Sequence, residues 1–483
     1  MKKLRVVALA TIVAGVAATV AVAGQVNTGP SSSQSPYVVP VEAAPGIQTR
    51  SIITVGDSPA GSSYRMVGIP DGLGAFSNGD GTFTLLMNHE LNATAGVARA
   101  HGGTGAFVSR WVIDQDTFEV KSGTDQIRRV FLWQGGNYVQ TAGVQFSRFC
   151  SADLPEKSAF FNDGAGYDGR IYLNGEETGA EGRGFAHIVT GPDAGSSYEL
   201  PAIGNMSFEN SLAHPGTGAK TVVVANEDAG DGQVYVYVGQ KKASGNPVER
   251  AGLTGGTLYG IKVNGLTQET DASPTAETGF TAVSLGDVSG LTGAQLETAS
   301  DAAGVTGFNR PEDGSWDPSN PRDYYFVTTA SINGKSRLWR LRFTDPANPA
   351  LGGTVAAVLD GSEGQHMMDN ITVDDGHVLI EEDPGSNNPT GVTNYIAKLW
   401  LYDIASDKLV QIAVLDPDRF TPGLPGFLTA DEESSGIIPA PFLGRGWYLL
   451  DVQAHYAIPG ELVEGGQLLA LHLPPGQVRN LLR

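Results

Sequence analysis

Acidic residues of this chain gather in short clusters with Asn, Ser and Gly at the ends of apolar segments. A hard cation such as calcium takes six to eight oxygen ligands, which several such clusters can supply together. A strand-end Asp or Asn also caps turns, so the pattern indicates a metal centre only if distant clusters converge. The clusters are Asn88-His89-Glu90, Glu176-Glu177, Ser207-Phe208-Glu209-Asn210, Asn226-Glu227-Asp228, Arg310-Pro311-Glu312-Asp313, Asp369-Asn370, Glu381-Glu382-Asp383 and Asp431-Glu432-Glu433-Ser434.

Two of these clusters are acidic pairs that follow strongly apolar segments, Glu176-Glu177 and Glu381-Glu382. Like charges held close together are costly unless a cation or a proton neutralises them. Because neighbouring side chains of a strand face opposite sides, only one member of each pair is expected to reach a shared site. We predict that Glu177 and Glu382 do so and bind metal.

Arg310 lies two residues before Glu312, a spacing that puts both side chains on one face of an extended chain. A guanidinium beside metal-bound carboxylates can clamp a phosphoryl oxygen. We therefore predict Arg310 and Glu312 as catalytic residues, with Glu312 also a metal ligand. The alternative is a structural Arg–Glu ion pair.

The single cysteine, Cys150, excludes an internal disulfide. A lone thiol is either a small buried apolar group or a reactive thiolate that binds metal or acts as a nucleophile. Four of the eight histidines flank acidic clusters and are candidate ligands or acid–base groups. They are His89, His214, His366 and His455.

The elements that must position these residues are strands. The chain has 64 Gly and 27 Pro, and sustained helical spacing of apolar residues occurs only around Gly290 to Ala303. One strand type recurs, as SRLWRLRF (Ser336 to Phe343), AKLWLYDI (Ala397 to Ile404) and GQLLALHL (Gly466 to Leu473). Recurrence indicates repeated blades, so we predict an all-β, six-bladed β-propeller with short helical insertions, whose central channel gathers distant loops. A pair of β-sandwich domains is the alternative.

The N-terminus predicts export, to the periplasm or the extracellular space. Lys2, Lys3 and Arg5 precede an apolar run that ends in Ala21-Val22-Ala23, which is typical of a signal peptide over residues 1–23. The Ser-, Pro- and Gly-rich stretch over 24–44 predicts a disordered linker. Residues 45–483 are then one propeller domain.

The formal net charge of −21 becomes −24 once Lys2, Lys3 and Arg5 leave with the signal peptide. Such a surface repels nucleic acid and anionic lipid. We expect a small-molecule substrate, no nucleic acid partner, no membrane partner after signal cleavage, and a monomer. The absence of G-x-S-x-G and of G-x-x-x-x-G-K-[ST] argues against an α/β-hydrolase and a P-loop enzyme.

Seven short segments occur in a fixed order from about residue 45 to the C-terminus. They are Asn88-His89-Glu90, Cys150 with Glu176-Glu177, Ser207 to Asn210, Arg310-Pro311-Glu312, Met368-Asp369-Asn370, Glu433 to Gly436 and Val452-Gln453-Ala454-His455. This order resembles the PhoX family of exported bacterial alkaline phosphatases. The segment from Cys150 to Glu176 is longer here, and Phe208 stands where the family has histidine.

The resemblance implies a six-bladed propeller that hydrolyses phosphate monoesters with Fe3+ and Ca2+ in its channel, and it makes Arg310 the grip on the substrate phosphate. A calcium-dependent propeller lactonase or esterase, and a non-catalytic propeller stabilised by calcium, are the rival hypotheses. Together the clusters and the resemblance predict the metal ligands Cys150, Glu177, Glu209, Glu312, Asp369, Glu382 and Glu433. The resemblance implies that Cys150 binds ferric iron.

Overall fold

The computed structural model describes residues 24–483, so the predicted signal peptide lies outside the described residues. This part of the chain contains 31 strands and four short α-helices. None of its helices combines the length and the apolar composition that a membrane crossing requires.

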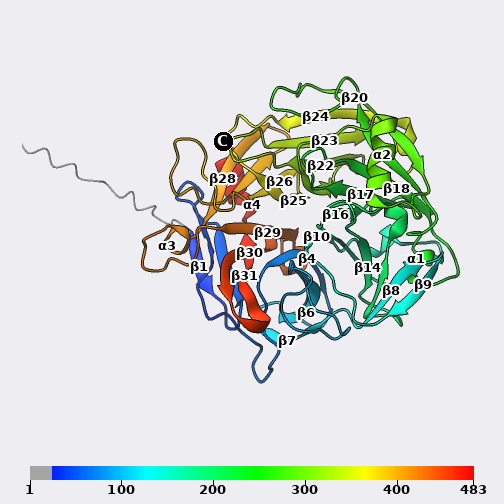
Figure 1. Ribbon diagram of the computed structural model, residues 1–483. Helices are drawn as coiled ribbons and strands as arrows, with labels where there is room; N and C mark the ends of the chain where they lie inside the picture. Colours follow the sequence, from blue (N-terminus) through cyan, green and yellow to red (C-terminus); the bar gives the residue numbers. More distant parts are fainter. Residues whose placement is uncertain (1–23) are drawn as a thin grey trace, which may run out of the picture.

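The strands form sheets that radiate from a common centre (Figure 1). The first sheet is β4 (Pro70–Ser77), β5 (Thr82–His89), β6 (Phe107–Asp114) and β7 (Val120–Asp125). The second, in spatial order, is β10 (Phe149–Asp153), β13 (Ile171–Glu176), β14 (Gly184–Ile188), β15 (Ser196–Glu199), β8 (Arg129–Gln134) and β9 (Asn137–Thr141). A hairpin of β11 (Phe161–Asn162) and β12 (Ala165–Gly166) stands apart.

A nine-stranded sheet continues the arrangement and has an innermost strand at each end. Its order is β16 (Phe208–Ala213), β17 (Lys220–Glu227), β18 (Val234–Gln240), β19 (Thr257–Val263), β20 (Thr278–Gly286), β24 (Gly353–Leu359), β23 (Arg337–Phe343), β22 (Asp323–Thr328) and β21 (Pro311–Trp316). The pairing of β20 with β24 at the periphery therefore joins two radial units into one sheet.

The last two sheets take their outermost strands from the N-terminal segment. One is β25 (Met368–Asp374), β26 (His377–Glu382), β27 (Lys398–Asp403), β28 (Lys408–Leu415) and β2 (Val38–Pro40). The other is β29 (Glu432–Pro439), β30 (Trp447–Ile458), β31 (Val463–His472), β3 (Gln48–Thr54) and β1 (Gln25–Thr28).

Six strands line the centre, and each contacts the next until the ring closes: β4, β10, β16, β21, β25, β29 and β4 again. This arrangement is a β-propeller, so the predicted fold class is confirmed and the alternative of two sandwich domains is wrong. The number of blades stays a prediction, and the ring of six inner strands favours six.

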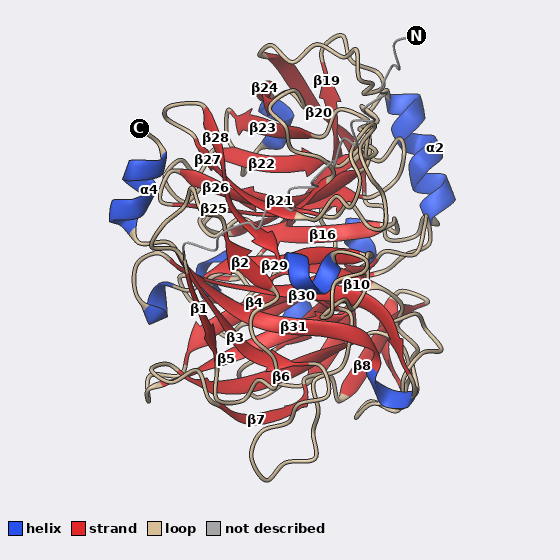
Figure 2. Ribbon diagram, turned by 90° about the vertical axis from the view of Figure 1, so that its left-hand side faces the viewer, coloured by secondary structure: helices blue, strands red, loops and turns tan. Residues whose placement is uncertain are grey.

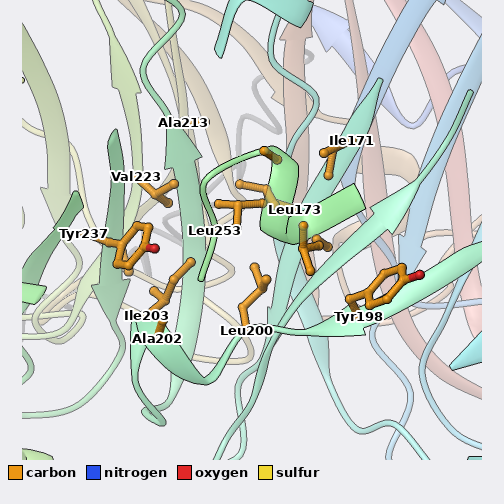
Figure 3. Packing of buried hydrophobic residues seen from close by; sticks show 14 of the residues in the cluster. Ile171, Leu173, Tyr198, Leu200, Ala202, Ile203, Ala213, Val223, Tyr237 and Leu253 are labelled. Carbon is orange, nitrogen blue, oxygen red and sulfur yellow. The ribbon is translucent and has the colours of Figure 1, made fainter. Parts of the chain in front are cut away.

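Apolar side chains between neighbouring sheets hold the ring together. In β17, six consecutive residues from Thr221 to Asn226 are fully or nearly fully buried, as expected for a strand that is covered on both faces. Figure 3 shows one such cluster, in which Leu173 of β13, Val223 of β17 and Leu253 meet. The strands are thus fixed by packing rather than by a disulfide.

The segment that we predicted to be a disordered linker is ordered, and this corrects the expectation for residues 24–44. Strand β1 pairs in parallel with β3, and β2 pairs with the edge of β28. Tyr37 and Val38 are buried in the cluster between the last two sheets. Composition predicted disorder because so polar a segment cannot bury enough surface alone, whereas here the sheets supply the partner surface.

The helices lie outside the sheets: α1 (Pro247–Arg250), α2 (Gly293–Ala303), α3 (Pro417–Phe420) and α4 (Pro475–Leu481). Figure 2 shows α2 and α4 on opposite sides of the molecule. Helix α2 confirms the one helical pattern in the sequence. It begins with a capping box at Thr292 and Gln295 and ends at Gly304, whose left-handed conformation suits glycine.

Replacing Val38 with Ala tests whether the N-terminal segment closes the propeller. Val38 is fully buried, so we expect a loss of roughly 2 kcal/mol in the free energy of unfolding, measured by urea denaturation. Val26→Ala in β1 is the matched control, because Val26 is 38% exposed and should change stability by less than about 0.5 kcal/mol. Equal effects of the two variants would contradict the closing role.

Candidate metal centre

The second residue of every inner strand is acidic or a thiol, and all six are buried. We call them the inner ring. They are Asp71, Cys150, Glu209, Glu312, Asp369 and Glu433. The register of each inner strand shifts at or shortly after this level, which marks a β-bulge. A bulge re-aims side chains and ends regular pairing, so the same backbone device recurs around the channel.

A second set of residues, the outer row, follows the same repetition one strand farther out. Behind each inner strand, one residue of the next strand or directly after it donates its backbone N–H to the carbonyl of the residue just before the inner strand, over 2.9 or 3.0 Å. Five of these residues directly follow the end of their strand, and His455 lies within β30. These residues are Glu90, Glu177, Asp228, Thr329, Asp383 and His455.

Carboxylates of the two sets converge. Three groups have ligand atoms that all lie within 4.8 Å of one another, and they share Cys150 and Glu209. The groups are Asp71 with Glu90 and Cys150, Cys150 with Glu177 and Glu209, and Glu209 with Glu312 and Asp369. Five of the six inner strands, all except β29, thus contribute to one continuous cluster.

Gln453 of β30 links the cluster to Glu433. Its Nε2 lies 3.1 Å from Asp71 Oδ2, 3.0 Å from Glu90 Oε2 and 3.2 Å from Glu433 Oε1. One amide nitrogen therefore contacts carboxylates from three strands. Its two N–H groups cannot offset three negative charges, so further positive charge or protons are required.

Asparagines of neighbouring radial units fix two of the inner-ring residues. Asn88 Nδ2 donates to the backbone carbonyl of Cys150, and Asn226 Nδ2 donates to the carbonyl of Glu312. The Oδ1 of each asparagine accepts a hydrogen bond from a tyrosine hydroxyl, that of Tyr172 in β13 for Asn88 and that of Tyr324 in β22 for Asn226. These buried networks hold the bulged backbone that presents the thiol and the carboxylate.

Burial raises the pKa of five inner-ring carboxyls well above the usual range, and neighbouring carboxylates add to the effect. The five are Asp71, Glu209, Glu312, Asp369 and Glu433. Burial and the Asp71 carboxylate also raise the pKa of the Cys150 thiol. Burial and Glu90 raise the pKa of Glu177 to about 8. These shifts favour the protonated forms in the protein alone, and bound cations would displace such protons.

Two arginines lie at the edge of the cluster in equivalent positions, each immediately before an inner strand. Arg310 Nε and Nη2 bind Asp228 in a fork at 2.8 and 2.7 Å, and Nη2 lies 2.9 Å from Glu312 Oε1. Arg310 and Glu312 are therefore in contact, as both the catalytic prediction and the alternative of a structural ion pair require. The backbone at Arg310 is left-handed, with φ 61°, whereas we expected an extended conformation before Pro311.

Arg148 repeats this arrangement before β10. Its Nη2 binds Glu177 and lies 2.7 Å from Glu90 Oε1, and its backbone is left-handed with φ 46°. Within residues 24–483 the Nη1 atoms of Arg148 and Arg310 have no hydrogen-bond partner, and the side chains are 42% and 35% exposed. Two guanidinium nitrogens are thus free to meet an anion at the edge of the cluster.

Glu382 is the predicted ligand that the structure does not bring to the cluster. Its carboxylate accepts hydrogen bonds from four neighbouring groups: His366 N, Tyr395 Oη, Lys398 N and Trp400 Nε1. Strand β13 ends at Glu176, the first residue of its acidic pair, so Glu177 belongs to the outer row. Strand β26 ends at Glu382, the second residue of its pair, so Asp383 occupies the outer-row position instead.

Three of the four candidate histidines make structural contacts. His89 bonds to Gly68 O and Ser109, His214 bonds to Pro321 O, and His366 bonds to Ile332 O. Only His455 belongs to the outer row.

Sequence reasoning missed Asp71 and Arg148. Asp71 follows Pro70 at the start of an inner strand just as Glu312 follows Pro311, which is a signal that could have found it. Arg148 had no such mark, because its partners Glu90 and Glu177 lie far away in sequence.

A cavity of about 550 Å³ lies farther along the same inner strands, on the other side of the inner ring. Its lining includes Gly74, Leu212 and Val373, which follow the inner-ring residues in β4, β16 and β25. This cavity is therefore separate from the arginines and the acidic cluster.

Fold and site together define the chain as a β-propeller whose channel is ringed by carboxylates. Among solved structures it is similar to Pseudomonas fluorescens PhoX in complex with vanadate, a transition state analogue, with a TM-score of 0.66 and 12% identity over 90% of this chain and 96% of that one. At this identity the likeness shows the fold.

Two weaker likenesses have TM-scores of 0.33 and 0.32. The first is to a putative 6-phosphogluconolactonase from Bacteroides uniformis, with 12% identity over 74% of this chain and 88% of that one. The second is to the β-propeller domain of the Trilobed protease from Pyrococcus furiosus, with 5% identity over 81% and 93%. No family model matches the chain, and no curated protein matches it.

The raised carboxyl pKa values predict how pH changes the stability of the metal-free protein. An acid whose pKa is higher in the folded state binds more protons when folded, so the free energy of unfolding falls as pH rises between the two pKa values. For Glu177 this window runs from about 4.5 to about 8. In a chelator, thermal unfolding should occur at a lower temperature at pH 8.5 than at pH 5.5.

Added calcium should remove most of this pH dependence, because bound cations replace the protons. Calorimetry with calcium at both pH values is the control. A melting temperature that stays constant or rises with pH in the chelator would contradict the repulsive cluster.

Proposed function

We propose that this protein is an exported, metal-dependent hydrolase of phosphate monoesters and a divergent member of the PhoX family. One observation carries the proposal. A buried cluster of carboxylates and a thiol lies in contact with two arginines, and each arginine keeps one nitrogen free. A purely structural calcium site would use the arginines as ion-pair partners of the carboxylates, but it would not need their free Nη1 atoms.

The donor set fits the proposed cations. Carboxylate oxygens from several strands suit calcium, and the combination of Cys150 with carboxylates suits ferric iron. Such cations would polarise a phosphoryl group and lower the pKa of a bound water. The proposed ligands are Cys150, Glu177, Glu209, Glu312, Asp369 and Glu433, together with Asp71 and Glu90.

In this proposal Arg310 binds a phosphoryl oxygen through Nη1. Asp228 takes Nε and Nη2 in a two-point contact, which fixes the plane of the guanidinium before any ligand arrives. The positive charge also offsets Glu312, which would otherwise repel a phosphate dianion. The positive charge of Arg148 likewise offsets Glu90 and Glu177 on the other side of Glu209.

Export, action as a monomer on a small phosphate ester, and the lack of nucleic acid or membrane partners belong to the same proposal. A formal charge of −21, or −24 after signal cleavage, makes local neutralisation by cations and arginines a condition for binding an anionic ester.

Metal removal and reloading test the function. We expect the protein to hydrolyse 4-nitrophenyl phosphate, to lose this activity in a chelator, and to regain it with calcium and iron. Elemental analysis of protein purified without chelator should find both metals. Hydrolysis of 4-nitrophenyl acetate or a lactone without turnover of the phosphate ester would favour a lactonase or esterase. No hydrolysis with any metal would favour a binding module.

Arg310→Lys tests the phosphate grip. Lysine keeps the charge but loses the fork, so we expect kcat/KM for 4-nitrophenyl phosphate to fall roughly 10- to 1,000-fold, with weaker inhibition by free phosphate and unchanged metal content. Arg445→Lys is the matched control, because Arg445 binds Asp375 through two nitrogens at an exposed site. Near-native turnover and phosphate inhibition in Arg310→Lys would remove Arg310 from the site.

A further inference from the structure

His455 is held at one ring nitrogen and free at the other. Its Nδ1 lies 2.7 Å from Glu464 Oε2 of the adjacent strand β31. Within the described part of the chain its Nε2 has no hydrogen-bond partner, and the side chain is 28% exposed. A carboxylate on Nδ1 fixes the orientation of the ring and leaves Nε2 as the atom that can exchange a proton.

The backbone places His455 at the same level as the acidic members of the outer row. Its N–H donates to Asp431 O, just as the N–H of Glu177 donates to Arg148 O and that of Asp383 to Met367 O. Four of the six outer-row positions hold carboxylates, one holds Thr329, and His455 is the one imidazole. It therefore borders the candidate metal centre without belonging to the inner ring.

Four carboxylates on different elements face His455. Glu464 comes from β31, Asp431 from the segment before β29, Glu90 from the end of β5 and Asp383 from the end of β26. Burial alone would lower the pKa of the imidazole, but the hydrogen bond to Glu464 and the charges of Glu464, Asp431 and Glu90 outweigh it and raise the pKa. The shift favours the protonated ring, whereas burial lowers the pKa of His89 to about 3.

We propose that His455 is the general acid of this site and that its Nε2–H protonates the leaving-group oxygen of a phosphate monoester. The role rests on the proposed function. The P–O bond to the alcohol breaks, that oxygen takes the proton from Nε2, and a water oxygen forms the new bond to phosphorus. The proton released by the water restores the imidazolium through solvent, so the products are an alcohol and phosphate.

This role predicts a dependence on the leaving group. An alkoxide is a poor leaving group without a proton, whereas 4-nitrophenolate leaves without one. The substrate class follows, because a site with its own acid can cleave alkyl phosphates such as glycerol phosphate as well as activated aryl esters.

Replacing His455 with Gln tests the proposal. On the metal-loaded protein, kcat/KM for glycerol 2-phosphate should fall about 100-fold or more, while kcat/KM for 4-nitrophenyl phosphate should fall less than about fivefold. Metal content should not change. Equal losses on both esters, no loss on either, or loss of metal would overturn the acid role and leave the proposed function standing. An inactive loaded wild-type protein would overturn both.

Two further variants control for folding and for histidine loss in general. Glu464→Gln keeps a hydrogen-bond partner without the charge, so it should lower the pKa of His455 in an NMR titration and slow the alkyl ester selectively. His377 lies away from the cluster, where its Nε2 is 3.2 Å from Asp403 Oδ2. His377→Gln should therefore leave both rates unchanged. An unshifted pKa of His455 in Glu464→Gln, or a selective loss in His377→Gln, would contradict the proposal.

Discussion

Repulsion among buried carboxylates is the constraint on which the rest of this structure depends. Closing the inner strands into a ring brings the second residue of each to the channel, and these residues are Asp or Glu in five strands and Cys150 in the sixth. Packing of apolar sheets supplies the free energy that holds such a cluster in place. The cluster in turn requires protons, arginines or cations, and this requirement links the fold to metal chemistry.

The two arginines show how this requirement acts locally. Arg148 and Arg310 both adopt a left-handed backbone, which is uncommon for a residue with a long side chain and costs free energy. Each contacts two carboxylates from different parts of the chain. The strain and the contacts recur at equivalent positions, so they follow from the repeat rather than from one irregular loop.

Much of the fold and part of the site could be predicted from the sequence. Recurring strands such as Ala397 to Ile404 indicated the propeller, and acidic strand ends indicated Glu209, Glu312 and Asp369, which the structure brings together. The prediction for Glu382 was wrong because β26 ends at the second residue of its acidic pair, whereas β13 ends at the first. Residues 24–44 were misread because β2 pairs with β28, more than 350 residues away, and β1 pairs with β3, which is itself held by β31.

The way in which the ring closes determines when the cluster can form. Strand β3, near the N-terminus, pairs with β31, near the C-terminus, and Gln467 bonds to the backbone of Tyr37 across 430 residues. Contacts of such separation form late in folding, because a long loop must close before they yield any stabilisation. The carboxylates of β4 and β29 come together across this seam, as Asp71 and Glu433 do at Gln453. A chain that emerges from a ribosome or a translocon therefore cannot present the complete acidic cluster to metal until its last sheet has been made and its first strands have docked.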